Sequence, residues 1–253
     1  MDAPVDVVGR AAALLRAVSA AEPAGAGTSE VARSVGLARP TTHRLLTSLA
    51  EAGLTERDPT GRWVLGAELY FLGSAAATRY DVTSIARPVV RRLSAATGES
   101  AFFSARSGDE TICLVREDGS FPIRSHVLHE GIRFPLGVAS AGLAILAYLD
   151  DPALEAYLAR DDLRGRYGDQ HRADALRDRV ARTRRAGWAL NPGLIVEGSW
   201  GMAAAVFDAE ERPRWALSLT GIEQRFQRAR QRELGPLLLH EAHALSRALQ
   251  RHA

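Results

Sequence analysis

The chain has 253 residues, 46% of them hydrophobic and 25% charged, which is the composition of a globular protein long enough for two domains. Its net charge of +2 gives no bulk basicity that would indicate nucleic-acid binding, and its single cysteine, Cys113, excludes an intrachain disulfide and a cysteine metal cluster. No stretch approaches the roughly 18 apolar residues of a membrane span, so we expect a cytoplasmic protein without a signal peptide.

Two helical patterns open the chain. Apolar residues recur at helical spacing and predict a first helix with one apolar face; they are Val7, Ala11, Leu14, Leu15 and Val18. A second helix is predicted to begin at Thr28, which can act as its N-cap, and Glu30 suits the positive end of the helix dipole. Gly36 stands where the end of a helix requires a positive φ. A short helix followed by such a turn is typical of a helix-turn-helix motif.

The third helix carries the strongest functional signal. Pro40 fits its first turn, where the missing N–H costs nothing. Positions 42, 45, 46 and 49 repeat at helical spacing, and the three leucines among them are expected to pack inward. The complementary stripe can hydrogen-bond outward and consists of Thr41, Arg44, Thr47 and Ser48. No acidic residue occurs from Ala38 to Ala50, although the first 65 residues hold seven arginines and seven acidic residues. The local charge pattern therefore favours a helix that enters the major groove of DNA.

A predicted β-hairpin follows this helix directly. Strands are expected at 54–57 and 62–65, around the turn-forming tetrapeptide Asp58–Gly61. A hairpin in this place is the wing of a winged helix-turn-helix, with arginines on its strands placed to meet phosphates. The candidate DNA contacts are Thr28, Arg39, Thr41, Thr42, His43, Arg44, Thr47, Ser48, Arg57 and Arg62. The alternative is an ordinary helical hairpin with a solvated polar face.

The rest of the chain changes character twice. Residues 66–80 carry Leu69, Leu72 and Ala76 and predict an amphipathic connecting helix that can also serve as a dimer contact. Helical spacing continues from Val82 to Gly98. Strands are then predicted at 100–106, 111–117, 122–127, 202–208 and 214–220, and helices at 139–149, 152–159, 173–186 and 231–250. This order indicates an α+β sensor-like domain rather than a doubly wound α/β enzyme.

Five segments together resemble the IclR family of bacterial transcriptional regulators. They are GLARPTTHRLL at 36–46, RWVLG at 62–66, GIRFPL at 131–136, GWA at 187–189 and ALSLTG at 216–221, in order along nearly the whole chain. The resemblance implies two domains of α+β class: a winged helix-turn-helix DNA-binding domain over 1–66, a linker helix over 67–80, and a GAF-like effector domain over 81–253. It further implies a six-stranded antiparallel sheet flanked by helices in the effector domain. Homodimers or dimers of dimers would bind double-stranded operator DNA and respond to a small carboxylate-bearing or aromatic metabolite.

The resemblance also implies a set of effector-binding residues, namely Ser140, Ala141, Asn191, Gly201, Ser218 and Thr220. The backbone at Ser140 and Ala141 matches the family's oxyanion-binding turn, and free N–H groups at a helix start suit a carboxylate physically. Ser218 and Thr220 lie two residues apart on a predicted strand and point to one side, where they bind the effector or bond within the sheet.

Three positions depart from the family pattern and leave the ligand's identity open. Gly201 stands where the best-known members carry a cysteine, which should enlarge the pocket or remove a polar contact. Leu143 replaces a usual lysine, and Gly137 replaces a frequent histidine.

The main alternative function is a small-molecule-processing enzyme with an appended helix-turn-helix. The sequence contains no P-loop, no Rossmann fingerprint, no HExxH and no Gly-x-Ser-x-Gly. The pairs His126/His129 and His240/His243 lack the i, i+4 spacing of helical zinc sites. We therefore expect no catalytic residue, no metal and no cofactor. An adaptor that uses the winged helix for protein contacts is a third possibility, but such a face is more often apolar or aromatic.

Overall fold

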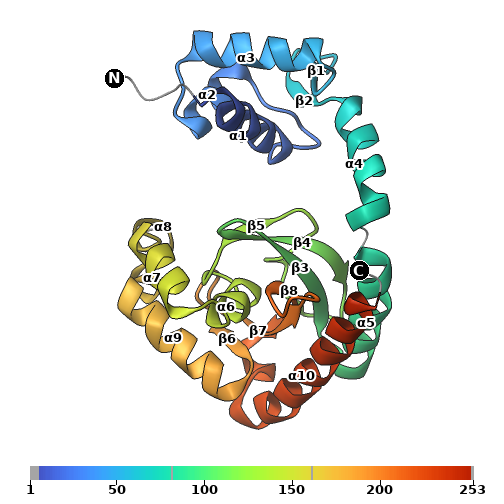
Figure 1. Cartoon of the computed structure of the whole chain (residues 1–253), viewed down its shortest axis with the longest axis vertical. Helices are drawn as coiled ribbons and strands as arrows, with labels where there is room; N and C mark the ends of the chain where they lie inside the picture. Colours follow the sequence, from blue (N-terminus) through green and yellow to red (C-terminus); the bar gives the residue numbers. More distant parts are fainter. Residues whose placement is uncertain (1–5, 81, 161, 252–253) are drawn as a thin grey trace. The chain divides into compact units, whose positions relative to one another are not determined.

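The computed structural model describes residues 6–80, 82–160 and 162–251 and forms two compact units, residues 1–81 and 82–253 (Figure 1). The domain boundary predicted at position 81 lies outside the described residues. Across the described ranges, no helix combines the length and apolar character needed to cross a membrane.

The N-terminal unit contains the predicted three helices and wing. Helices α1 (Val7–Ser19), α2 (Thr28–Val35) and α3 (Arg39–Glu51) precede a hairpin of β1 (Thr55–Arg57) and β2 (Trp63–Leu65) and the helix α4 (Ala67–Tyr80). The three helices and the wing surround one core, formed by Leu14, Val18, Ala26, Val31, Leu46, Leu49 and Trp63. The apolar spacing in the sequence correctly selected most of these residues. Val7 was also predicted to lie on the apolar face of the first helix, but it is exposed at the start of α1.

The turn between α2 and α3 is set by Gly36. This residue has φ 67° and ends α2 in the left-handed conformation, and the N–H of Leu37 donates to the carbonyl of Ala32 at 3.0 Å. The start of α2 differs from the prediction, since Gly27 rather than Thr28 is the N-cap. Glu30 reaches back to accept the Gly27 N–H at 2.8 Å. This hydrogen bond and the nearby Arg62 lower the pKa of Glu30.

The wing is attached to the helices through Trp63. Its backbone pairs with Ala26, with N···O distances of 2.8 and 2.9 Å, and its Nε1 donates to the Thr28 hydroxyl at 2.9 Å. Thr55 donates to the Leu46 carbonyl of α3 at 3.0 Å. These contacts fix the position of the hairpin relative to α3 within the unit.

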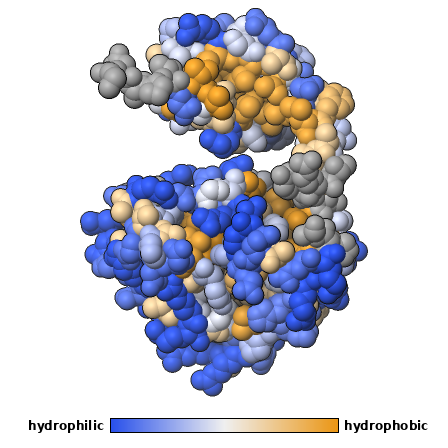
Figure 2. Space-filling model, in the orientation of Figure 1, coloured by the Kyte–Doolittle hydropathy of each residue, from blue (hydrophilic) through white to orange (hydrophobic). Residues whose placement is uncertain are grey.

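Helix α4 begins against the residues that precede the wing, and its side chains from Tyr70 to Ala77 are exposed. The N–H of Glu68 donates to the Gly53 carbonyl at 3.2 Å. Beyond it, Tyr70, Phe71 and Leu72 are all exposed, Tyr70 by 74%. Leu72 was expected on a packing face, but its side chain is 53% exposed. Figure 2 shows hydrophobic residues gathered over α1 and along α4 of this unit.

The C-terminal unit is built on one antiparallel sheet of six strands, in the order β5-β4-β3-β8-β7-β6. The strands are β3 (Ser100–Ser107), β4 (Glu110–Glu117), β5 (Arg133–Pro135), β6 (Ala189–Pro192), β7 (Ser199–Phe207) and β8 (Pro213–Ile222). The six-stranded sheet expected from the family resemblance is therefore confirmed. The strand predicted at 122–127 is wrong, because this segment forms bends in which Arg124 donates to the Gly119 carbonyl at 2.8 Å. The short edge strands β5 and β6 were not predicted.

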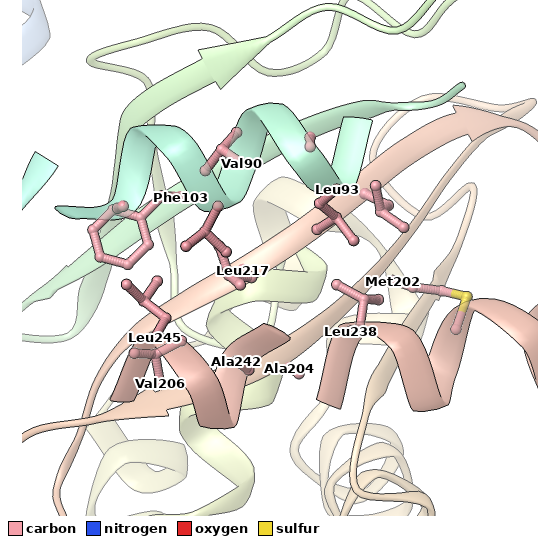
Figure 3. Packing of buried hydrophobic residues seen from close by; sticks show 14 of the residues in the cluster. Val90, Leu93, Phe103, Met202, Ala204, Val206, Leu217, Leu238, Ala242 and Leu245 are labelled. Atoms are coloured by element: carbon pink, nitrogen blue, oxygen red, sulfur yellow. The ribbon is translucent and has the colours of Figure 1, made fainter. Parts of the chain in front are cut away.

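Helices cover both faces of the sheet (Figure 1). On one face α5 (Thr83–Thr97) and α10 (Arg228–Gln250) pack through Val90, Leu93, Leu238 and Leu245 onto Phe103 and Leu217 (Figure 3). On the other face lies α6 (Ser140–Ala147), followed by α7 (Asp151–Arg160), α8 (Arg164–Tyr167) and α9 (Ala173–Ala186). The sheet residues facing α6 are small, namely Ala189, Ala203, Ala205 and Ala216. Small residues there allow α6 to approach the strands closely.

Candidate functional site

The outward edge of α3 is polar and basic. Arg39, His43, Arg44 and Ser48 are exposed, and Thr41 and Thr47 are partly exposed. Neither Arg39 nor Arg44 has a hydrogen-bond or ion-pair partner anywhere in the described ranges. We call these six residues the α3 edge. Its free guanidinium groups can bind phosphate or a base edge without breaking an internal contact.

Thr42 does not belong to this edge, which corrects its prediction as a DNA contact. The residue is fully buried, and its Oγ1 has no hydrogen-bond partner among the residues that the structure describes. The physical reason is the helical spacing of positions 42, 46 and 49, which turns Thr42 toward the same core as Leu46 and Leu49.

Arg57 extends the basic surface from the wing. Its guanidinium carbon lies 4.0 Å from the centroid of the Trp63 ring, and its NH2 lies 3.4 Å from Nε2 of His43. Its NH1 donates to the Gly61 carbonyl at 2.5 Å. The side chain remains exposed, so the structure brings Arg57 and His43 together beside α3.

Arg62, also predicted to meet phosphates, is engaged inside the unit, although its side chain is 40% exposed. Its NH2 forms an ion pair with Glu30 at 2.8 Å, and its guanidinium donates to the carbonyls of Ala24 and Gly25 at 3.0–3.2 Å. Thr28 is likewise occupied, since its hydroxyl accepts the Trp63 indole N–H. Sequence spacing alone cannot show these contacts, because the partners lie more than 30 residues apart.

The predicted effector residues meet on the face of the sheet beside α6. Cα pairing places Asn191 opposite Gly201 and Gly201 opposite Thr220, in one row across β6, β7 and β8. Ser218 pairs with Ala203 in the next row on the same face. Ser140 begins α6 above this row, and the N-cap residue, Ala139, makes no side-chain hydrogen bond to the helix start. The N–H groups of Ser140 and Ala141 have no hydrogen-bond partner in the described part of the chain, as expected at a helix start.

A small cavity lies between this row and α6. It has a volume of about 20 Å³ and is lined by Val127, Leu128, Ala139, Ser140, Asn191, Ile195, Ser199, Trp200, Gly201 and Thr220. Ala141 and Ser218, which we predicted as site residues, do not line it. The apolar lining residues were missed because their segment at 127–128 and the early start of β7 were not recognised.

Gly201 does not produce the enlarged pocket that its missing side chain suggested. A Cβ at this position would lie 3.0 Å from the Ser140 hydroxyl, so Ser140 and α6 occupy the space. The 20 Å³ that remain suffice for about one water molecule. A metabolite can enter only if α6 or the lining loops move.

The polar side chains of these strands differ in their hydrogen bonding. Asn191 donates from Nδ2 to the Val138 carbonyl at 2.7 Å and accepts the Leu194 N–H at 2.9 Å, so its amide holds β6 to its neighbouring loops. The buried hydroxyls of Ser218 and Thr220 have no partner among the described residues. The structure gives neither hydroxyl a partner within the sheet, and Thr220 lines the cavity whereas Ser218 lies buried beside it.

A buried ion pair supports the end of the row. Both carboxylate oxygens of Glu99, which is 2% exposed, accept from Arg225 at 2.6 and 2.9 Å. Arg225 also donates to the Ile123 carbonyl at 3.0 Å and lies over the Phe121 ring. The pair ties the segment after β8 to the start of β3 and to the 121–123 loop.

Cys113 and the other potential metal ligands form no chemical centre in the described residues. Burial raises the pKa of the Cys113 thiol to about 12, so the group remains a neutral thiol at physiological pH. Across residues 6–80, 82–160 and 162–251, no group of three or more His, Cys, Asp or Glu side chains is arranged to hold a metal ion.

Two family models match the chain. The model described as IclR helix-turn-helix domain matches residues 7–59, and the model described as bacterial transcriptional regulator IclR C-terminal matches residues 74–247. The glycerol operon regulatory protein of Streptomyces coelicolor is 30% identical over 248 residues, which are 96% of this chain and 94% of the relative. The transcriptional repressor IclR of Escherichia coli is 27% identical over 221 residues, 85% of this chain and 79% of the relative.

Solved structures share the fold. The IclR transcriptional regulator from Alicyclobacillus acidocaldarius matches with a TM-score of 0.79 at 24% identity, covering 98% of this chain and 100% of that one. An IclR homolog from Microbacterium hydrocarbonoxydans complexed with 4-hydroxybenzoate matches with a TM-score of 0.75 at 22% identity, with the same coverage.

Proposed function

The chain belongs to the IclR family of bacterial transcriptional regulators, and we propose that it reads operator DNA through the α3 edge under the control of a small-molecule effector. In this proposal residues 1–66 bind DNA, residues 67–80 connect the two domains, and residues 81–253 bind the effector and form the oligomer. A regulator of this kind works in the cytoplasm, where the DNA lies. The observation that carries the proposal is that Arg44 is exposed on α3 and free of any internal partner in the described chain.

The geometry of the unit suits the major groove. The groove is about 12 Å wide and admits one helix, whose side chains reach the base edges. Trp63 and Thr55 hold the wing against α3, so the exposed Arg57 is placed to meet the phosphate backbone beside the groove. Arg44 would donate to a base, and Arg39, at the first position of α3, would contact a phosphate or a base.

We predict that Arg44→Ala weakens binding to the operator by about 1–3 kcal/mol, because one bidentate base contact contributes about that much discrimination. Fluorescence anisotropy with a labelled operator duplex, found by selection from random DNA, measures the loss. The matched control is Thr42→Val, which changes a buried residue of the same helix and should leave the affinity unchanged. Equal affinity of Arg44→Ala and the native protein would exclude α3 as the reading helix.

Dimerisation would supply the second reading helix. The N-terminal unit exposes Tyr70, Phe71 and Leu72 on α4, and Val7 and Val8 on α1, and a second copy can cover such apolar side chains. Dimeric helix-turn-helix proteins place two recognition helices in grooves about 34 Å, or one helical turn, apart. We therefore propose a homodimer or a dimer of dimers. An effector that changes the spacing of the two helices changes operator affinity, and thermodynamic linkage makes DNA change effector affinity by the same factor, typically about 5–150-fold.

The effector site of this proposal is the cavity beside α6, opened by its ligand. The unpartnered hydroxyl of Thr220, that of Ser218 beside it, and the free N–H groups at the start of α6 favour a carboxylate-bearing or aromatic metabolite. Family members are transcriptional regulators, and we assign no catalytic step to this unit.

Filling this cavity should abolish the response to the effector. We predict that Gly201→Val removes the thermal stabilisation given by carboxylates such as 4-hydroxybenzoate while keeping operator affinity in their absence, because the new side chain would press against Ser140 and leave no room for a ligand beside α6. Differential scanning fluorimetry over a panel of aromatic and aliphatic monocarboxylates measures the effect. Ala203→Gly is the control, since it changes a neighbouring β7 residue without filling the cavity. Carboxylates that stabilise Gly201→Val as strongly as the native protein would place the effector elsewhere.

A further inference from the structure

A second and larger cavity lies where α9 meets the edge strand β6. Its volume is about 320 Å³, within the range of small-molecule sites. It is lined by Leu143, Gln170, Arg179, Arg182, Thr183, Ala186, Trp188, Leu190, Pro192 and Leu194. None of these residues lines the cavity beside α6.

Arg179 is the unusual member of this lining. It is only 5% exposed, and none of its three guanidinium nitrogens has a hydrogen-bond partner among the described residues. Burial lowers the pKa of Arg179 to about 10, with a further contribution from the positive charge of Arg182, so the group still carries its charge at neutral pH. An unpaired charge out of water is costly, and buried charges in proteins are therefore normally paired.

The fold holds this cation on a packing face. Leu176, Arg179, Val180 and Thr183 follow the i, i+3, i+4, i+7 spacing of α9, and all four are buried. The neighbouring His171 supplies no negative charge. Its Nδ1–H donates to the Tyr167 carbonyl at 2.8 Å, and burial, with the charge of Arg179, lowers the pKa of the ring.

The remaining walls are largely apolar. Leu143, Trp188, Leu190 and Leu194 offer aliphatic and indole surface, whereas the exposed Arg182 and Gln170 stand at the rim. No carboxylate side chain lines the cavity in the described chain. The site thus combines a planar cation that can bind a carboxylate through two parallel N–H···O bonds with a hydrophobic compartment.

We propose that this cavity is a second ligand site, which takes a small carboxylate with an apolar body. The carboxylate pairs with Arg179, and the body packs against Trp188 and the leucines. Leu190 and Pro192 line this cavity while Asn191, between them on β6, lines the cavity beside α6, as alternation along a strand requires. The chain would then carry two neighbouring but separate sites on one edge strand.

Isothermal titration calorimetry of the full-length protein with benzoate, phenylacetate and hexanoate tests this assignment. Arg179→Met should lose one binding event or weaken it by about 10–100-fold, because hydrogen bonds to the charged group are removed. Arg185→Met is the matched control, since Arg185 is an exposed arginine of the same helix that does not line the cavity. The neutral isostere benzamide should bind this site weakly in all three proteins. Identical titrations of Arg179→Met and Arg185→Met with all three carboxylates would overturn the proposal.

A second readout separates ligand binding from a structural role. The ligand-binding role implies that the guanidinium of Arg179 is unpaired in the ligand-free protein. Arg179→Met should then raise the melting temperature of the ligand-free protein, because an unpaired buried charge is replaced by an apolar side chain of similar length. A lower melting temperature, with Arg185→Met unchanged, would show that Arg179 stabilises the fold and would overturn the proposal. So would a loss of oligomeric mass in light scattering with carboxylate binding intact, because a carboxylate of a second copy would then be the partner. Operator affinity, measured in parallel, should not change in Arg179→Met. A failure of the proposed DNA binding is therefore distinguishable from a failure of the proposed second ligand site.

Discussion

Replacing Arg225 with methionine should destabilise the C-terminal unit by about 3–5 kcal/mol, because it leaves the carboxylate of Glu99 buried without its partner. The native carboxylate accepts two hydrogen bonds from one guanidinium, a bidentate geometry that is stronger than two separate neutral bonds. The same substitution frees the Ile123 carbonyl and the end of β8 next to Thr220. We therefore expect lower stability and a less ordered effector cavity together.

Urea denaturation of Arg225→Met, Glu99→Leu and the double variant measures this coupling. Replacing both partners should recover much of the lost stability, since the double variant no longer buries an unpaired charge. The control is Arg177→Met, which breaks the exposed pair with Glu155 and should change the stability little, because solvent screens that pair. If Arg225→Met lowers the free energy of unfolding by less than about 1 kcal/mol, the ion pair of Arg225 and Glu99 contributes little to stability.

Trp63→Ala should destabilise the N-terminal unit by about 3–5 kcal/mol, the usual cost of truncating a buried tryptophan. Trp63 contacts the core of all three helices, donates its indole N–H to Thr28, and supports the guanidinium of Arg57 on its ring. Since the wing depends on these contacts, we expect the variant to lose operator binding as well.

Hydrogen exchange of the α3 backbone amides reports this effect locally. A loss of 3 kcal/mol or more should speed exchange by roughly 100-fold or more when the opening equilibrium governs exchange. Trp215→Ala, in the C-terminal unit, serves as the control and should leave α3 exchange unchanged. Native-like protection of α3 in Trp63→Ala would contradict the role assigned to the indole.

The sequence allowed the longer helices and the long strands to be predicted from their apolar patterns and the turns between them, whereas the four-residue α8 was not predicted. The winged helix-turn-helix followed from Gly36, Pro40 and the Asp58–Gly61 turn, all of which act locally. The edge strands β5 and β6 escaped prediction, since three or four residues are too few to show alternation. The residue pattern predicts a strand at 122–127, but the segment bends, because its conformation depends on the hydrogen bonds of Arg124 and Arg225.

Site residues were harder to predict than elements. The outward direction of Arg44 follows from helical spacing, and the same spacing, applied strictly, would have placed Thr42 in the core. The engagement of Arg62 by Glu30 depends on a tertiary contact that no local pattern shows. Arg179 left a signal in the sequence that was overlooked, because it interrupts the apolar face of α9 between Leu176 and Val180.

The central claim is that the outward side chains of α3 discriminate between bases. Selecting bound duplexes from a random library with the native protein and with Arg44→Ala tests it most directly. We predict that the variant keeps the half-site spacing and loses its base preference at one or two positions per half-site, each by about 1–3 kcal/mol. An unchanged preference at every position in the variant would show that Arg44 does not read DNA and would contradict the claim.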